Sequence, residues 1–170
     1  PAWVNGILQP LEKLEAHKFG LKHKAISDFV FHNDKILLQR RALGKYHTPG
    51  LWANTCCTHP NWNETDIDCA NRRVFEELHL TGLELKNRGR IEYRADVGQG
   101  LIEHEVVEIF TAICSTPPKV TPNPEEVMET KWLDQIKLAN KVETNPDEFT
   151  PWLRIYMSKH FEQISGTITA

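Results

Sequence analysis

The sequence predicts an α+β fold, in which a mixed β-sheet core is flanked by helices. Stretches with the alternation typical of strands recur along the chain, and only two stretches have the apolar spacing of a sizeable helix. A long series of βαβ units would need helices between successive strands, and this chain lacks them. Its 170 residues are enough for a hydrophobic core, so we expect a single domain over residues 1–170.

The first predicted element is a β-hairpin over residues 24–41. "KAISDFVFH" alternates loosely, "KILLQRR" follows it, and the dipeptide "ND" between them favours a turn. A loop marked by Gly44, Pro49 and Gly50 comes next, and we interpret "LWANTCC" as one short strand. "RIEYRADV" and "LIEHEVVEIFTAI" predict two further strands, joined by the turn "GQG".

Two sizeable helices are predicted, the first from Thr65 to about Leu80. Thr65 is a favourable N-cap, and an apolar stripe follows it at Ile67, Ala70, Val74 and Leu78. Later in the chain "VMETKWL" predicts a last strand with a small helix after it. From about Phe149, "FTPWLRIYMSKHFEQI" predicts a terminal amphipathic helix, and Pro151 suits its first turn.

Composition excludes several classes of protein. The net charge of −3 argues against a general nucleic-acid binder but leaves room for a local basic pocket. No apolar run approaches the length of a membrane span, and the N-terminal residues lack the pattern of a signal peptide. We therefore expect a cytoplasmic monomer that binds neither nucleic acid nor membrane. The four cysteines include no C-x-x-C pair, which argues against a zinc ribbon, and do not form a disulfide framework.

The stretch "NTCCTHP" places a thiol close to an imidazole. Side chains of an extended strand alternate between faces, so Thr55, Cys57 and His59 would share one face, and Pro60 favours an extended His59. Cys56 would then point the other way as a small core residue. The alternative for Cys57, a buried apolar side chain, is weaker because His59 lies on its face.

Two carboxylates and two further histidines could complete a site. Glu103 and Glu105 in "IEHEVV" would share one strand face. A solvated edge is the alternative, but the flanking apolar residues indicate a buried strand, where an acidic pair needs a metal, a shared proton or a basic partner. His17 and His23 have a spacing that fits no helical face, and each alone is typical of a surface histidine. Converging with His59, these groups would suit a zinc- or manganese-like ion of high coordination number.

The predicted helix around "ETDIDCANRRVFEELHL" is close to the Nudix box, G-x5-E-x7-R-E-U-x-E-E-x-G-U, where U is apolar. The matching positions are Glu64, Arg72, Val74, Glu76, Glu77 and Leu80. Arg73 stands where the box has a glutamate, and Thr58 and His79 replace its glycines. Nudix hydrolases gather Mg²⁺ around the helix glutamates to cleave a diphosphate, whereas an arginine there favours contact with a diphosphate oxygen. The departure predicts a pocket that holds a diphosphate without cleaving it.

Four motifs together carry a more specific resemblance. "RRALGKYHTPGLWANTCCTHP", "RRVFEEL", "YRADVGQGLIEHE" and "FTPW" resemble the type I isopentenyl-diphosphate isomerase family, which has a Nudix-like fold, from about Leu11 to the terminal helix. The resemblance implies that Cys57 and Glu105 are the catalytic pair, assisted by Tyr93, and that Trp152 is the active-site aromatic residue.

The same resemblance implies two kinds of metal site and a substrate site. One Mn²⁺ or Zn²⁺ would be bound by His17, His23, His59, Glu103 and Glu105. A Mg²⁺ would arrive with the substrate diphosphate, held by the carboxylate of Glu77 and a backbone oxygen of Cys57. The diphosphate itself would be bound by Lys13, Arg41, Lys45 and Arg73, although scattered surface charge is the alternative for Lys13, Arg41 and Lys45. The chain departs from the family at Thr58, which occupies a glycine position, and in the interval between the first two histidines, which is one residue shorter than in bacterial members.

The implied reaction interconverts isopentenyl and dimethylallyl diphosphate in isoprenoid biosynthesis. The small-molecule diphosphate would be protonated by Glu105, helped by Tyr93, to give a tertiary carbocation, and deprotonated by Cys57. Two alternatives remain from the sequence. A Nudix pyrophosphohydrolase is disfavoured by Arg73, and a metal-stabilised binding module would leave Cys57 and Trp152 without a purpose.

Overall fold

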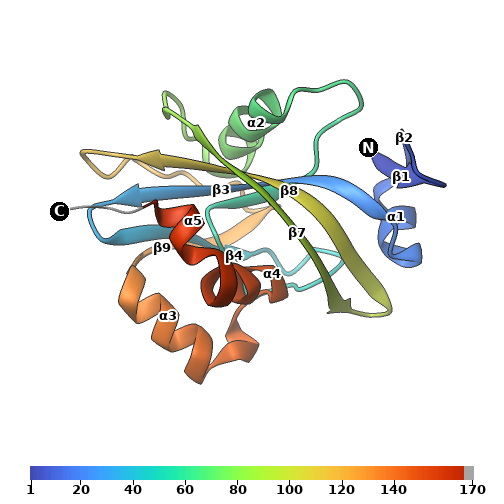
Figure 1. The fold of residues 1–170 in the computed structure, drawn as a ribbon. Coiled ribbons are helices and arrows are strands. Elements are labelled where there is room, and N and C mark those ends of the chain that lie inside the picture. Colours follow the sequence, from blue (N-terminus) through green and yellow to red (C-terminus); the bar gives the residue numbers. More distant parts are fainter. Residues whose placement is uncertain (167–170) are drawn as a thin grey trace.

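A computed structural model describes residues 1–166 of the chain (Figure 1). Its strands are β1 Ala2–Val4, β2 Ile7–Gln9, β3 Lys22–His32, β4 Lys35–Arg41, β5 Trp52–Ala53, β6 Cys56–Thr58, β7 Lys86–Gly98, β8 Leu101–Ile113 and β9 Val127–Asp134. Its helices are α1 Lys13–Phe19, α2 Asp66–Leu78, α3 Gln135–Thr144, α4 Pro151–Ile155 and α5 Phe161–Ser165, with a 3₁₀ turn at Pro146–Glu148 and a π-helical turn at Tyr156–His160. The predicted α+β class with a mixed sheet is confirmed.

Strand β3 organises the sheet because different parts of it pair with four other strands. It runs parallel to β8, from Lys22 opposite His104 to Phe31 opposite Ile113. It is antiparallel to β1, β4 and β6. The sheet continues antiparallel on both sides, through β7 next to β8 and β9 next to β4. The first half of β3 is therefore the place where the start of β8 and the end of β6 meet.

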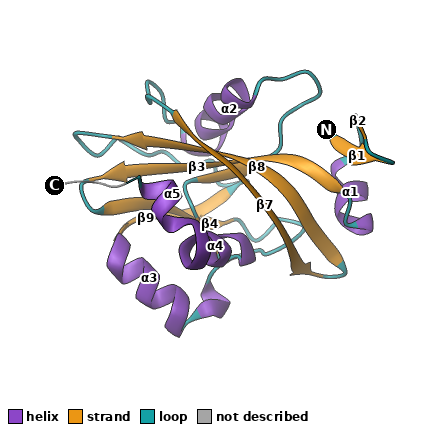
Figure 2. Ribbon diagram, viewed as in Figure 1, coloured by secondary structure: helices purple, strands orange, loops and turns teal. Residues whose placement is uncertain are grey.

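Helices cover both faces of this sheet (Figure 2). Helix α2 packs on one face, where Cys56, Val74 and Leu78 are fully buried. Helices α3, α4 and α5 lie on the other face, where Phe29 of β3 and Trp152 of α4 belong to the larger core cluster. Within the described residues, every helix is too short or too polar to cross a membrane.

Helix α2 forms as its sequence predicts. The Thr65 side chain accepts a hydrogen bond from the backbone N–H of Asp68, which caps the first turn. His79 ends the helix with φ 53°, the left-handed conformation that glycine adopts most easily, and this explains why the Nudix box has a glycine there. The predicted apolar stripe is wrong at Ile67, which is 38% exposed, while Cys69 is buried.

Other elements differ from the sequence prediction. "LWANTCC" forms two strands, because Trp52–Ala53 pairs with β4 whereas Cys56–Thr58 crosses over to pair with β3. The strands β1 and β2 and the helix α1 are additional elements near the N-terminus. The terminal helix is not continuous, since the π-helical turn at Tyr156–His160 separates α4 from α5.

Candidate active site

The strand register places the predicted acid and thiol groups around one point. On β8, Glu105 is opposite His23 of β3 and opposite Tyr93 of β7. On β6, Cys57 is opposite Ser27 of β3. Glu103 lies two residues before Glu105, and both are buried, at 3% and 5% exposed. The predicted alternation along β8 therefore holds.

Three histidines and Glu105 form a group that fits a metal ion. One ligand atom from each of His17, His23, His59 and Glu105 lies within 4.8 Å of the others. Nδ1 of His17 donates to the carbonyl of Lys13, and Nδ1 of His23 donates to the carbonyl of Leu21, each at 2.7 Å. Because the proton of each ring is on Nδ1, each Nε2 atom is unprotonated and keeps a free lone pair. Both Nε2 atoms are buried without a hydrogen-bond partner. Ring nitrogens oriented in this way by a second hydrogen bond are typical of metal ligands.

Helix α1 explains how His17 and His23 converge. His17 is near the end of α1, and Gly20 turns the chain with φ 58° into β3, where His23 lies. The two imidazole centroids are 4.8 Å apart. A Cβ at position 20 would approach the side chain of Ile102 to 3.3 Å in a strained conformation, so this turn favours glycine.

Glu103 and Glu105 share a single phenol. The Tyr93 hydroxyl is 2.9 Å from Oε2 of Glu103 and 2.7 Å from Oε2 of Glu105. Burial, followed by the charge of Glu105, raises the pKa of Glu103 well above its usual range. Burial also acts to raise the pKa of Glu105, but the imidazoles of His23 and His59, with Nε2 atoms 3.5 Å and 2.9 Å from its Oε1, outweigh burial and hold that pKa well below its usual range. Since one phenol donates only one proton, this acidic pair needs a further proton or a cation beside it.

The predicted diphosphate-binding residues line the same pocket as Cys57, Tyr93 and Trp152. They are Lys13, Arg41, Lys45 and Arg73. Their charges are already partly balanced, because Lys45 forms an ion pair with Glu126, and Arg73 lies 3.4 Å from the same carboxylate. Burial lowers the pKa of Lys45 to about 8. The guanidinium of Arg41 stacks 5.2 Å from the ring centroid of Trp152.

Glu77, the predicted Mg²⁺ ligand, lies behind Arg73 on helix α2. It is 3% exposed, and it accepts hydrogen bonds from Arg73 at 2.5 Å and from Gln39 at 2.9 Å. Arg73 also contacts Glu76 at 2.8 Å. Glu76 and Glu77, two glutamates of the Nudix box, thus contact Arg73, which replaces another glutamate of the box.

The two neighbouring cysteines have different surroundings. Cys57 lines the pocket, and burial raises the pKa of its thiol. Cys56 is fully buried in the core beneath α2. The alternation predicted for this stretch holds for Cys57 and His59, but Thr55 does not reach the pocket, because its hydroxyl bonds the backbone of β3 and β4 at Val30 and Leu37.

Some pocket residues were missed by sequence reasoning. The structure adds Tyr46, His47 and Thr58 to the lining. His47 forms a second candidate metal group with His17 and Glu103, so Glu103 does not lie in the same group as the other four predicted ligands. Nε2 of His47 is 3.7 Å from Oε1 of Glu103. In the sequence, the sign that His47 could belong to the pocket was its position two residues after Lys45.

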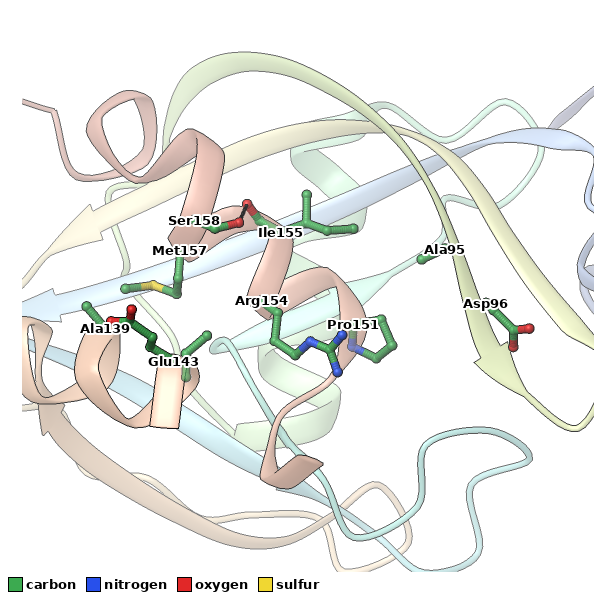
Figure 3. Close-up of a pocket in the computed structure, with 10 residues that line it drawn as sticks. Ala95, Asp96, Ala139, Glu143, Pro151, Arg154, Ile155, Met157 and Ser158 are labelled. Atoms are coloured by element: carbon green, nitrogen blue, oxygen red, sulfur yellow. Dashed lines mark hydrogen bonds between the residues drawn. The ribbon is translucent and has the colours of Figure 1, made fainter. Parts of the chain in front are cut away.

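A separate cavity of about 840 Å³ lies beside this pocket (Figure 3). It is bordered by Ala95 and Asp96 of β7, Glu143 of α3, and Pro151 and Arg154 of α4. None of the predicted site residues lines it, so cavity size does not identify the site in this fold.

Comparison with known proteins agrees with the geometry. A model of the NUDIX domain matches residues 21–153. The isopentenyl-diphosphate Delta-isomerase of Dinoroseobacter shibae is 60% identical over 99% of this chain and 96% of the relative. The chain belongs to the isopentenyl-diphosphate isomerase family, within the Nudix fold. Other members of the family, from Cereibacter sphaeroides and Rhodobacter capsulatus, are 61% and 56% identical, over 99% and 100% of this chain and 95% and 97% of their own lengths.

Solved structures place this isomerase-family chain among Nudix folds by shape alone. DR0079 from Deinococcus radiodurans has a TM-score of 0.66 at 12% identity, covering 79% of this chain and 80% of its own. A MutT protein from Methanosarcina mazei has a TM-score of 0.64 at 15% identity, covering 80% of this chain and 90% of its own. The predicted Nudix-like fold and the predicted family are both confirmed.

Proposed function

We propose that the protein interconverts isopentenyl and dimethylallyl diphosphate by moving protons to and from the carbon skeleton. The observation that carries the proposal is that the thiol of Cys57, the Tyr93–Glu105 pair and the ring of Trp152 line one pocket together with four cations. Relatives that match this chain over nearly its full length are isopentenyl-diphosphate Delta-isomerases, which supports the proposal.

The cations would hold the diphosphate, which fixes the position of the alkene. Arg73 can offer a planar fork of N–H donors to two phosphate oxygens, and Lys13, Arg41 and Lys45 add positive charge. Lys45 and Arg73 would exchange Glu126 for the more highly charged phosphate. A Mg²⁺ bound with the substrate would use the carboxylate of Glu77.

Two groups at the alkene would carry the chemistry. Glu105, through the hydroxyl of Tyr93, gives a proton to the terminal alkene carbon, and the positive charge forms on the tertiary carbon. Cys57, as the thiolate, then removes a proton from the adjacent carbon, and the double bond forms there. The proton gained by Cys57 and the one lost by Glu105 are exchanged with solvent before the next turnover. One C–H bond forms and one breaks, so no oxidant or reductant is needed. The roles reverse for the back reaction.

The metal would be held by His17, His23, His59 and Glu105, with Glu103 and His47 beside them. Mn²⁺ and Zn²⁺ both accept imidazole nitrogen and carboxylate oxygen. Such an ion lowers the pKa of a carboxylic acid bound to it, which makes that acid a better proton donor to a weakly basic alkene.

Trp152 would stabilise the positive charge and keep water away from it. The ring is 2% exposed, and a cation facing an aromatic ring in a desolvated site gains about 2 kcal/mol. Such a gain is too small by itself, so the oriented carboxylates of the pocket would supply most of the stabilisation. Excluding water matters because water would trap a tertiary cation as an alcohol.

Incubation with isopentenyl diphosphate in D₂O tests the proposal. The metal-loaded protein should produce dimethylallyl diphosphate that carries deuterium, and Cys57→Ala should produce none above background. Formation of unlabelled product would exclude protonation from exchangeable groups. Release of phosphate from a nucleoside diphosphate derivative, with no isomerisation, would favour a Nudix hydrolase instead.

A further inference from the structure

The sulfur of Cys57 lies between two polar neighbours outside the predicted catalytic set. Its Sγ is 2.8 Å from Oδ1 of Asn54 and 3.2 Å from Oγ of Ser27. Ser27 is 1% exposed, and its position opposite Cys57 is fixed by the pairing of β3 with β6. The thiol therefore has a defined partner on each side.

The direction of these hydrogen bonds follows from counting protons. Nδ2 of Asn54 donates to the carbonyls of Asp28 and Cys56, at 3.0 Å each, so both amide protons are used and Oδ1 faces the sulfur. An amide oxygen only accepts, so the thiol proton of Cys57 is donated to Asn54. Ser27 must then donate its own proton to the sulfur.

A second hydroxyl orients the first. The Tyr156 hydroxyl is 2.9 Å from Oγ of Ser27, and since the proton of Ser27 is directed to the sulfur, Tyr156 donates to Ser27. Tyr156 is fully buried and packs edge-on against Phe29 and Tyr93, with centroids 5.7 Å and 5.9 Å apart. Its hydrogen-bonded path to Cys57 runs through Ser27.

The backbone at Tyr156 is unusual. Tyr156 begins the π-helical turn that follows α4, and π-helical turns are rare and often occur at functional sites. Figure 3 shows its neighbours Ile155, Met157 and Ser158 beside the separate cavity. Tyr156 itself lies in the core cluster on the sheet side of the segment.

We propose that Ser27 and Tyr156 are positioning residues that hold the sulfur of Cys57 in its reactive orientation. Tyr156 fixes the hydroxyl rotor of Ser27, and Ser27 supplies the sulfur with a hydrogen-bond donor, which Asn54 cannot do. The role rests on the proposed function, in which Cys57 exchanges a proton with the substrate.

A matched pair of substitutions at Ser27 isolates the hydroxyl. Ser27→Thr and Ser27→Val have the same shape, and both β-branched residues suit a strand, but only threonine keeps the donor. We expect Ser27→Val to lower kcat about tenfold relative to Ser27→Thr, the effect of one net hydrogen bond, while KM changes less than twofold. Equal kcat values in the two variants would overturn the proposal.

A double-mutant cycle tests whether Tyr156 acts through Ser27. Tyr156→Phe should lower kcat several-fold in the otherwise wild-type protein and should have no further effect in the Ser27→Ala background. Additive losses would show that Tyr156 contributes by packing alone, and the proposed role of Tyr156 would be wrong. Ser158→Ala is the matched control, since Ser158 is exposed and its hydroxyl bonds the carbonyl of Ile155.

A spectroscopic measurement separates this proposal from the proposed function. The S–H stretching band of Cys57, identified in a Raman difference spectrum against Cys57→Ala, should shift in Ser27→Val and keep its position in Ser27→Thr and Ser158→Ala. This measurement needs no substrate, so it holds even if the protein does not isomerise isopentenyl diphosphate. A band at the same frequency in Ser27→Val and the wild type would contradict the hydrogen bond itself.

Discussion

On one side, at the edge of the pocket, Nε2 of His17 and Nε2 of His23 are buried without a hydrogen-bond partner, whereas on the other side Lys45 and Arg73 already contact Glu126. We call the first side the histidine wall, which consists of His17, His23, His59 and Glu105. We call the second side the cation wall, which consists of Lys13, Arg41, Lys45 and Arg73. Both walls bind charged ligands in our proposal. In the histidine wall Nε2 of His59 contacts Oε1 of Glu105 at 2.9 Å, but Nε2 of His17 and Nε2 of His23 have no hydrogen-bond partner, whereas Lys45 and Arg73 of the cation wall both have a carboxylate partner in Glu126.

The difference has an energetic consequence. A buried polar atom without a partner costs roughly 1–3 kcal/mol, so the histidine wall destabilises the fold until an ion binds. In the cation wall Lys45 and Arg73 already pair with carboxylates, which a ligand must displace, although Nε of Arg41 and Nε of Arg73 are buried without a hydrogen-bond partner. We therefore expect the histidine wall to hold its ion tightly and the cation wall to bind its ligand reversibly, as a substrate requires.

The largest effect should follow from breaking the histidine wall. His17→Ala removes a ligand atom, so we expect metal affinity to fall more than 100-fold, beyond the roughly 10–100-fold loss typical of outer-shell partners, and activity to fall with it. Competition with a chelator measures the affinity. His104→Ala is the control, because His104 is on the same strand as Glu105 but contacts the exposed Glu92. Stoichiometric metal in active His17→Ala protein would contradict this assignment.

A smaller effect should follow from reversing a charge in the cation wall. Arg73→Glu places a carboxylate beside Glu76 and Glu77, so the KM for the diphosphate substrate should rise about 10–100-fold, as expected for the loss of a charge-assisted hydrogen bond. Steady-state kinetics give KM and kcat separately. Arg40→Gln is the control, since Arg40 is 40% exposed and pairs with Glu129. Unchanged KM and kcat in Arg73→Glu would mean that Arg73 serves only helix α2.

Removing the carboxylate of Glu126 from the cation wall should have a smaller effect. Glu126→Gln frees Lys45 and Arg73 from their competing partner, so we expect binding of inorganic diphosphate to tighten by about 2–5-fold, a difference of roughly 1 kcal/mol or less. Calorimetric titration at fixed Mg²⁺ measures it. Weaker binding in this variant would show that Glu126 orients the cations and does not compete with the ligand.

The smallest effect concerns a charged pair that belongs to neither wall. Arg72 of helix α2 bonds Glu64 through two nitrogens at 2.6 and 2.8 Å, and this partner lowers the pKa of Glu64 to about 2. A lowered pKa in the folded protein stabilises it above the ordinary pKa, and the stabilisation is lost as the pH falls from about 4.5 towards 2.

Glu64→Gln should therefore lower the free energy of unfolding by about 1 kcal/mol at pH 7 and by less at pH 3, with kcat unchanged. Urea unfolding at the two pH values measures the difference. An equal loss of unfolding free energy at both pH values would show that the Glu64–Arg72 pair stabilises the fold by packing and not by charge.

Local rules predicted the parts of the fold in which sequence and tertiary structure agree. Helix α2 has a capping threonine and a periodic apolar face, and the β3–β4 hairpin has alternation around a turn. Helix α1 has only 7 residues, so no periodic pattern could identify it. The division of "LWANTCC" depends on which neighbouring strand each half meets, and Thr55 links β3 and β4 there with its side chain. Such pairing between distant segments is invisible in a local pattern.

The site residues also divide into those that a local pattern predicts and those that it does not. Alternation alone placed Glu103 with Glu105 and separated Cys57 from Cys56, because two-residue periodicity is a property of the strand itself. The remaining candidates came from a family resemblance. His47 was missed because it lies in a loop, where the spacing of residues along the chain does not predict the direction of a side chain.

The π-helical turn at Tyr156–His160 changes the rotational phase of the terminal segment. Each residue of an α-helix advances about 100° around the axis, so one extra residue in a turn rotates all later side chains around that axis. Here the change of phase lets Trp152 before the turn and Ile164 after it both be buried in the same core cluster. A continuous α-helix of the same length would rotate one of the two away from the sheet. The wide turn thus connects the segment that closes the pocket to the segment that anchors it, and each keeps its own orientation.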